Sequence, residues 1–287
     1  MAASLNDPLH FYATYGPVTE PHHHRALLAA LPSDPVALCH IQQGLVIHLG
    51  LGHLYGWPVP PERMKTAELR GVAAMLTEIQ ALDSQPLHSP RPPERRLVGQ
   101  CRVSAVLFCA MLRTHGIPAC VRVGFANFHG WGLNGGNTWD HWVCDYWNEQ
   151  AQRWILIDPE QDDVLAKEIG LTIDPHDIPR DRFITAGAAW LACRRGEADP
   201  MQLGFDPTDA GMDYVRAHLL RELAALNKWE PGSSDKWGLS GRAATSLSEA
   251  DLVLLDQVAM ATEAGPSALA SIRELFLSDP RLRPTLD

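Results

Sequence analysis

The sequence predicts an α+β fold in which a cysteine-bearing helix packs on an antiparallel sheet, with extra helices on the N-terminal and C-terminal sides of this core. Three observations support this prediction. Residues 95–165 contain one amphipathic helical segment followed by strand-like runs. The flanking regions 20–85 and 164–280 show mainly helical spacing of apolar residues. With 46% apolar and 20% charged residues, the composition is that of a globular chain. We therefore expect residues 1–287 to form a single compact unit.

Three helices are expected before the central block. The first covers residues 22–31, and we interpret its leading histidines as a solvated helix start rather than a metal site. The second begins with Asp34-Pro35, an N-cap followed by proline at the first helical position, and runs to about Tyr55. It carries His48 and His53, which we interpret as buried or hydrogen-bonded histidines. The third covers residues 62–82, and the proline-rich segment after it marks the clearest internal boundary.

The central block and the C-terminal region follow in order. A helix is expected over residues 101–115, because apolar residues recur there at helical spacing and Gly116 follows as a C-terminal glycine. Residues 119–126 are expected to form a strand, and the glycine-rich segment 128–138 a mobile loop. Further strands are expected over residues 140–147 and 153–158. The remainder is expected to be mostly helical, over residues 180–195, 212–228, 248–261 and 266–277.

Charge and hydropathy exclude several classes of protein. The net charge of −10 gives no electrostatic support for general nucleic-acid binding. No apolar run approaches the 18 residues or so of a membrane-spanning helix, so no membrane partner is expected. The first residues lack the basic and apolar regions of a secretory signal. A cytoplasmic protein is therefore expected, and its six cysteines, which show no CxxC pair or common zinc spacing, are expected to be reduced thiols.

Cys101 is the strongest candidate for a nucleophile. It follows Gly99-Gln100 and opens the predicted helix 101–115. A thiol at a helix N-terminus meets the positive end of the helix dipole and free backbone N–H groups, which stabilise the thiolate and lower the pKa of the thiol. The same N–H groups can hold a developing oxyanion. The alternative, a buried structural thiol, remains open from this placement alone.

His141 and Asp158 are predicted to complete a catalytic triad. If Tyr146 pairs with Arg153 in the hairpin, His141 lies directly opposite Asp158. Opposed residues have Cβ atoms about 5 Å apart, so the carboxylate could hold the imidazole in one tautomer. Asp140 is a competing partner for the imidazole, but neighbouring residues on a strand point to opposite faces. A thiolate nucleophile, a general base and an orienting carboxylate follow.

Three segments together resemble the transglutaminase-like superfamily. Residues 99–119 resemble its nucleophile helix, and residues 140–147 and 153–159 resemble its histidine and aspartate strands, in the same order. Residues 183–190 and 223–230 resemble bacterial, uncharacterised members. The resemblance implies a papain-like core and the triad roles given above for Cys101, His141 and Asp158. The chain departs from those relatives at Val103-Ser104, where they tend to have an acidic and an aromatic residue. Members include proteases, amidases and inactive scaffolds.

Further candidates flank the triad. Gln100 could donate its side-chain amide to an oxyanion, or it could be an ordinary residue at a helix start. Trp139 and Trp142 could wall a substrate slot, or they could be part of an aromatic core. The acidic run 158–163 lacks the pattern of a calcium-binding loop, and the glycine-rich segment 130–136 lacks that of a phosphate loop. No metal site and no organic cofactor are expected.

The sequence therefore predicts an enzyme that transfers acyl groups through a cysteine thioester, by amide or thioester hydrolysis or by amide transfer. The expected partner is a small-molecule or peptide substrate. Two alternatives remain: a non-catalytic binding module that retains the fold, and a zinc protein that uses Cys101 and His141. The sequence defines neither the substrate, the acyl acceptor nor the oligomeric state.

Overall fold

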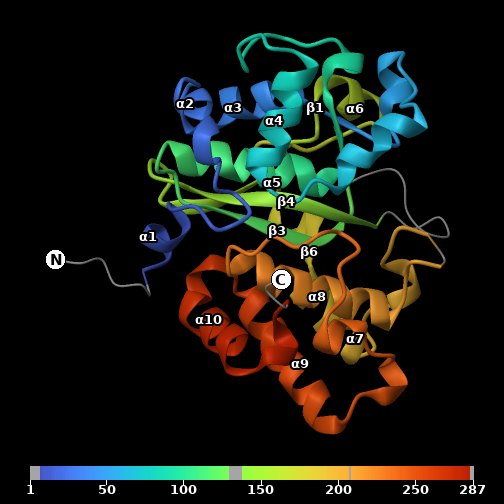
Figure 1. The fold of residues 1–287 in the computed structure, drawn as a ribbon. Helices are drawn as coiled ribbons and strands as arrows, with labels where there is room; N and C mark the ends of the chain where they lie inside the picture. Colours follow the sequence, from blue (N-terminus) through green and yellow to red (C-terminus); the bar gives the residue numbers. More distant parts are fainter. Residues whose placement is uncertain (1–6, 129–137, 207, 285–287) are drawn as a thin grey trace.

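A four-stranded antiparallel sheet lies between two groups of helices in the computed structural model, which describes residues 7–128, 138–206 and 208–284 (Figure 1). Its strands run in the order β5-β4-β3-β6. Their bounds are Ala119–Ala126 for β3, Trp139–Asn148 for β4, Arg153–Ile157 for β5 and Phe183–Thr185 for β6. A separate pair, β1 (Val46–His48) and β2 (Leu97–Gly99), is parallel. The fold is α+β, as the sequence predicts.

The helices divide into an N-terminal group, a central helix and a C-terminal group. Their bounds are Pro8–Tyr12 for α1, Arg25–Ala29 for α2, Pro35–Gln43 for α3, Val72–Leu82 for α4, Cys101–Thr114 for α5, Asp163–Glu168 for α6, Ala186–Arg194 for α7, Met212–Leu226 for α8, Glu249–Glu263 for α9 and Leu269–Ser278 for α10. No helix within the described ranges has the length and apolar character needed to cross a membrane.

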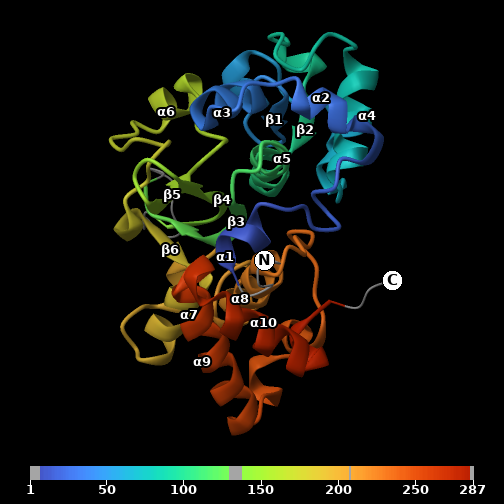
Figure 2. The same ribbon diagram turned by 90° about the vertical axis from the view of Figure 1, so that its left-hand side faces the viewer.

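Helix α5 is the centre of the first core. Every residue from Arg102 to Arg113 is buried, because the sheet covers one side of α5 and the N-terminal helices cover the other. Figure 2 shows α5 nearly end-on, between α2 to α4 and the strands. Full burial of each large aliphatic side chain contributes about 1.5–3 kcal/mol to folding. Packing on all sides therefore fixes the position of Cys101 at the N-terminal end of this helix.

The opposite face of the sheet carries α7 to α10, which form a second core. A buried ion-pair network links this face to α8. Arg122 of β3 contacts Asp145 of β4 at 2.8 Å and Glu222 of α8 at 2.7 Å. Because a buried charge is costly without its partner, this network stabilises the packing of α8 on the sheet.

Two of the predicted N-terminal helices are wrong in extent. The helix expected over residues 35–55 ends at Gln43, and β1 and a 3-10 turn over Gly52–Tyr55 follow. The β-branched pair Val46-Ile47 pairs with β2, a partner far along the chain. The helix expected over residues 62–82 splits into a 3-10 segment, Pro61–Glu68, and α4, because the chain is extended at Leu69 and Gly71.

The central predictions hold more closely. The helix expected to begin at Cys101 does so, and the strand expected over residues 119–126 has those bounds. The helix expected over residues 180–195 begins only at Ala186, because residues 183–185 form β6 at the sheet edge and pair with β3. Most of the predicted loop 128–138, residues 129–137, lies outside the described residues.

The predicted hairpin register is wrong by two residues. Asn148, not Tyr146, pairs with Arg153, and Cys144 pairs with Ile157. The turn is shorter than expected, with Gln152 in the left-handed region. A shift of two preserves which face each side chain takes. His141 and Asp158 therefore remain on one face, although Asp158 lies just past the end of β5.

Candidate active site

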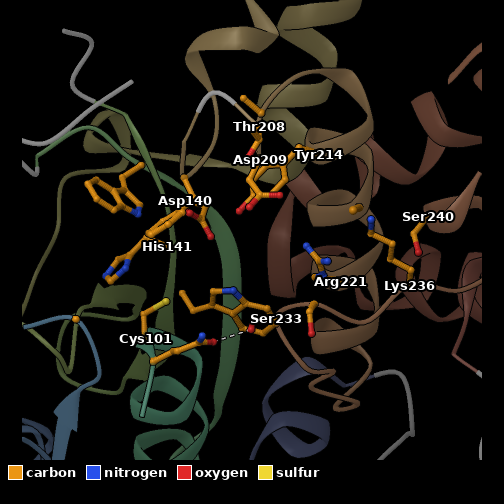
Figure 3. Close-up of a pocket in the computed structure, with 18 of the residues that line it drawn as sticks. Cys101, Asp140, His141, Thr208, Asp209, Tyr214, Arg221, Ser233, Lys236 and Ser240 are labelled. Carbon is orange, nitrogen blue, oxygen red and sulfur yellow. Dashed lines mark hydrogen bonds between the residues drawn. The ribbon is translucent and has the colours of Figure 1, made fainter. Parts of the chain in front are cut away.

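A cavity of about 940 Å³ lies between the core around α5 and the C-terminal half of the chain. Cys101 and His141 line one end of it, and side chains of α8 and of the loop 233–243 line the other. Figure 3 shows these two groups facing each other across the cavity. The cavity therefore extends from the predicted triad to α8 and the loop 233–243, which no sequence motif had linked to the triad.

Cys101 is placed by the tight junction between β2 and α5. A Cβ on Gly99 would lie 2.8 Å from the Cβ of Val103, so only glycine allows this approach. Gln100 is extended and accepts the first helical hydrogen bonds, from the N–H groups of Val103 and Ser104. The N–H groups of Cys101 and Arg102 therefore come before the hydrogen-bonded part of the helix. Cys101 itself is half-buried, and its sulfur points toward His141 (Figure 3).

The structure brings His141 and Asp158 into direct contact. Nε2 of His141 lies 2.8 Å from Oδ2 of Asp158, and both side chains are buried. The other oxygen of Asp158 accepts a hydrogen bond from the backbone N–H of Glu160 at 2.9 Å, which holds the carboxylate in place. The sulfur of Cys101 points toward the same imidazole (Figure 3). Because Asp158 engages Nε2, a thiol that hydrogen-bonds to this ring has to use Nδ1.

Burial and hydrogen bonding act in opposite directions on the two reactive groups. Burial lowers the pKa of His141, but the charge and hydrogen bond of Asp158 outweigh it and raise that pKa well above its ordinary value. Burial raises the pKa of the Cys101 thiol above its ordinary value, and the hydrogen bond from His141 opposes this rise. The sequence-based expectation of a lowered thiol pKa is therefore wrong in direction, because desolvation outweighs the imidazole. Proton transfer from sulfur to imidazole is instead favoured through the raised pKa of His141.

Asp140, the competing partner for the imidazole, points away from His141 as expected for the neighbouring strand residue. Its Oδ2 lies 3.4 Å from Nε2 of His218 on α8. Asp140 is thus engaged by the C-terminal half of the chain, whereas Asp158 is engaged by the triad histidine.

The other three predicted site residues occupy different positions. Gln100 lines the cavity, and its Oε1 accepts a hydrogen bond of 2.6 Å from the Ser233 hydroxyl. Trp139 is half-buried and packs edge-to-face on Phe205 at the cavity wall. Trp142 is only 1% exposed and belongs to the core around α5, although one side of it reaches the cavity. Its position fits the aromatic-core alternative.

Sequence reasoning missed several residues of the cavity wall. His48 ends β1 beside Gly99 and lines the cavity; burial, with a smaller effect from the charge of His141, lowers its pKa to about 4. Glu160 lines it beside the triad, and burial raises its pKa to about 8. On α8, Tyr214, His218 and Arg221 recur at the spacing of one helix face. Polar residues at core-facing positions of a buried helix are a signal that could have identified this wall.

Arg102 is the residue that brings the C-terminal loop to the start of α5. Its buried guanidinium donates to the carbonyl groups of Leu69 and Arg70 on one side, and to those of Glu230 and Pro231 on the other. The segment that carries Ser233 is thereby held next to Gln100.

Within the described ranges, no group of three or more His, Cys, Asp or Glu side chains is arranged to hold a metal ion.

Residues 63–159 match the family model described as Transglutaminase-like superfamily. No curated protein and no solved structure gives a significant match to the chain. The matched segment contains α5, β3, β4 and β5, and with them Cys101, His141 and Asp158. By this match, the segment 63–159 is similar to the transglutaminase-like superfamily, and its α+β core agrees with that similarity.

Proposed function

We propose that the protein is a cysteine-nucleophile enzyme that transfers acyl groups through a thioester, with Cys101 as nucleophile, His141 as general base and acid, and Asp158 as the carboxylate that orients His141. One observation carries the proposal: the Cys101 sulfur points toward His141, and Nε2 of His141 lies 2.8 Å from a buried carboxylate, at the wall of a large cavity (Figure 3). The superfamily, which is generally one of cysteine-based enzymes, supports the same chemistry.

The geometry supports the following reaction. His141 takes the proton of the Cys101 thiol, and the sulfur attacks the carbonyl carbon of an amide or thioester. The negative charge that develops on the carbonyl oxygen is held by the backbone N–H groups at the start of α5. His141 then gives its proton to the leaving group, and the carbon–heteroatom bond breaks to leave a thioester on Cys101. Water or an amine, deprotonated by His141, releases the acyl group and restores the thiol.

Asp158 and Gln100 support this reaction without bonding to the substrate carbon. Asp158 raises the pKa of His141 against the effect of burial, which strengthens the base. Ser233 holds the oxygen end of the Gln100 side chain. The amide nitrogen of Gln100 is then the end left to act as a second oxyanion donor.

The cavity volume suits a small molecule or a short peptide segment, since such sites usually have volumes of about 300–1,000 Å³. All six cysteines are free thiols, which supports a reducing, cytoplasmic setting as part of the proposal.

Trapping of the acyl-enzyme tests the proposal. The protein is incubated with aryl esters and alkyl thioesters of graded acyl length, and its mass is measured after acid quenching. We expect an added acyl mass on the Cys101 peptide. Cys193→Ala is a matched control, because Cys193 is also a half-buried thiol but lies outside the cavity. The adduct should persist in Cys193→Ala and vanish in Cys101→Ala.

The opposite result would favour the binding module. If no ester or thioester acylates Cys101 while the same compounds bind in the cavity, the catalytic proposal is wrong. Metal analysis of the purified protein addresses the zinc alternative, which requires about one zinc per chain that is lost in Cys101→Ala.

A further inference from the structure

The end of the cavity away from Cys101 is formed by α8 and by the loop 233–243. Arg221 on α8 lies between the Cys101–His141 end and the Lys236–Ser240 end (Figure 3). The family match ends at residue 159, so this wall lies outside the matched segment. Its chemistry must therefore be argued from its own residues.

Arg221 is a buried cation without an acidic partner. The residue is only 3% exposed, yet no carboxylate of the described residues lies within 4.0 Å of its guanidinium. Nη2 donates to the backbone carbonyl of Asp235 at 3.2 Å, and Nη1 lies 3.3 Å from Nδ1 of His218. Nε has no hydrogen-bond partner in the described part of the chain. An arginine side chain keeps its positive charge even when it is buried. Burial of a charge with an N–H group that has no acceptor costs free energy, and a bound anion that accepts from this N–H would reduce that cost.

Lys236 adds a second cation at the same end of the cavity. It is exposed, and among the described residues it too has no carboxylate within 4.0 Å. The hydrogen bond from Arg221 to the carbonyl of Asp235 holds the loop that carries Lys236 against α8. The positive charges of Arg221 on α8 and of Lys236 on the loop 233–243 therefore lie at the same end of the cavity.

The remaining cations of the wall are already paired. Arg216 contacts Asp213 at 2.9 Å, and Arg242 lies 3.7 Å from Asp251. Arg216 and Arg242 are therefore less available than Arg221 to bind an anionic ligand.

The acidic side chains of the wall form no direct ion pair with Arg221. Asp140 lies 3.4 Å from His218. Asp209 is exposed, and Glu160 lines the cavity near His141. The charges of Asp140 and Asp209 act on Arg221 from a distance, but among the described residues neither Arg221 nor Lys236 has a carboxylate within 4.0 Å.

We propose that Arg221 and Lys236 form an anion-binding subsite, which takes a carboxylate or phosphate group of the substrate while the carbonyl of that substrate reaches Cys101. Arg221 supplies planar N–H donors for one face of the anion, and Lys236 supplies a mobile point charge. The part of this proposal that concerns the substrate rests on the proposed acyl transfer. The preferred acyl compounds then carry a negative charge remote from the reacting carbonyl.

The two ends of the cavity are physically connected. Ser233, on the loop that carries Lys236, donates a hydrogen bond to Gln100, the residue before the nucleophile. An anion that orders this loop would also order Gln100. The subsite therefore selects the substrate and positions a residue next to Cys101.

Binding without catalysis is the first test. In Cys101→Ala, the affinities for adipate, inorganic phosphate and neutral adipamide are measured by calorimetry. We expect one or both anions to bind at least about tenfold more tightly than adipamide, a difference that charge-assisted hydrogen bonds supply. The comparison of adipate with phosphate distinguishes the two sources of the anion.

Second substitutions in the Cys101→Ala protein locate the subsite. Arg221→Gln should weaken anion binding at least about tenfold and Lys236→Gln less, because Lys236 is solvated. Arg221→Lys should restore part of the loss. Arg195→Gln removes an exposed charge just after α7 and outside the cavity, and should leave the affinity unchanged. Lys236→Gln and Arg221→Lys keep the test decisive if Arg221→Gln does not fold. If neither adipate nor phosphate binds more tightly than adipamide, or if anion binding is unaffected by all these changes, the proposal is overturned.

Turnover is the second test. Aryl esters of graded acyl length, each ending in a carboxylate or a matched carboxamide, are compared by kcat/KM with the intact Cys101 protein. We expect a preference for the carboxylate at one range of lengths, and its loss in Arg221→Gln. Turnover with no charge preference at any length overturns the substrate part of the proposal and leaves the acyl-transfer proposal standing. Anion binding that depends on Arg221, with no turnover of any ester, supports the subsite and contradicts the acyl-transfer proposal.

Discussion

The two ends of the cavity are built from different parts of the chain and by different means. The proposed catalytic end comes from α5 and two adjacent strands, and its side chains face one another: the Cys101 sulfur points toward His141, and His141 contacts Asp158 (Figure 3). The far end comes from α8 and a loop, and Arg221 there leaves an N–H group unused. Side chains that already contact one another in the free protein are positioned for catalysis. A side chain that lacks a hydrogen-bond partner is instead available to bind a ligand. Substitutions at each end should therefore have different signatures.

The largest expected effect is the loss of the nucleophile. Cys101→Ala removes the attacking atom and little volume, so we expect turnover of aryl esters to fall at least about 1000-fold while the protein stays folded. Cys193→Ala should keep normal turnover. Near-UV circular dichroism reports folding, since the chain has nine tryptophans. Turnover within tenfold of the unmodified protein in folded Cys101→Ala would remove the thiol from the mechanism.

The two aspartates beside His141 provide the next test of the catalytic end. Asp158 contacts the imidazole at 2.8 Å, whereas Asp140 contacts His218 at 3.4 Å. We expect Asp158→Asn to reduce kcat at least about 100-fold, and Asp140→Asn less than about tenfold. Steady-state kinetics of both folded variants would check this. A larger loss in Asp140→Asn would mean that the wrong carboxylate has been assigned to His141.

Sequence reasoning reached the catalytic end because its signals are local. Cys101 follows a glycine at a helix start, and the strand alternation keeps His141 and Asp158 on one face even with a register that is wrong by two residues. It missed β1 because a three-residue parallel strand is defined by its partner β2, far away along the chain. It missed Arg221 because the sequence of α8 does not tell which of its charged residues form ion pairs. That no carboxylate of the described residues contacts Arg221 is known only from the residues packed around α8 in the structure.

The pH dependence of Cys101 alkylation tests the bond between thiol and imidazole. Burial raises the pKa of Cys101, and His141 works against that rise. His141→Ala removes the lowering influence, so the pKa should rise further and the alkylation profile should move to higher pH. At pH 7, each unit of that shift reduces the thiolate fraction about tenfold. Rates of iodoacetamide labelling, followed by mass spectrometry of the Cys101 peptide, measure this.

Cys193 serves as the internal reference in the same samples. Burial raises its pKa to about 11, and His141 lies elsewhere, so its profile should be the same in both proteins. An unchanged Cys101 profile in His141→Ala would show that the imidazole does not act on the thiol.

The smallest expected effect concerns Glu160, where the catalytic end meets the loop before α6. Burial raises the pKa of Glu160 to about 8 in the folded protein, against about 4.3 in an unfolded chain. Between these values the folded state holds a proton that the unfolded state has released. The free energy of unfolding must therefore fall as pH rises through this window. Glutamine does not titrate, so the Tm of Glu160→Gln relative to the unmodified protein should increase from pH 5 to pH 8. Glu168→Gln, an exposed position on α6, should show no such trend. A relative Tm of Glu160→Gln that stays constant or falls over this range would show that the Glu160 carboxyl is ionised beside the triad, and that the catalytic end carries one more negative charge than its geometry implies.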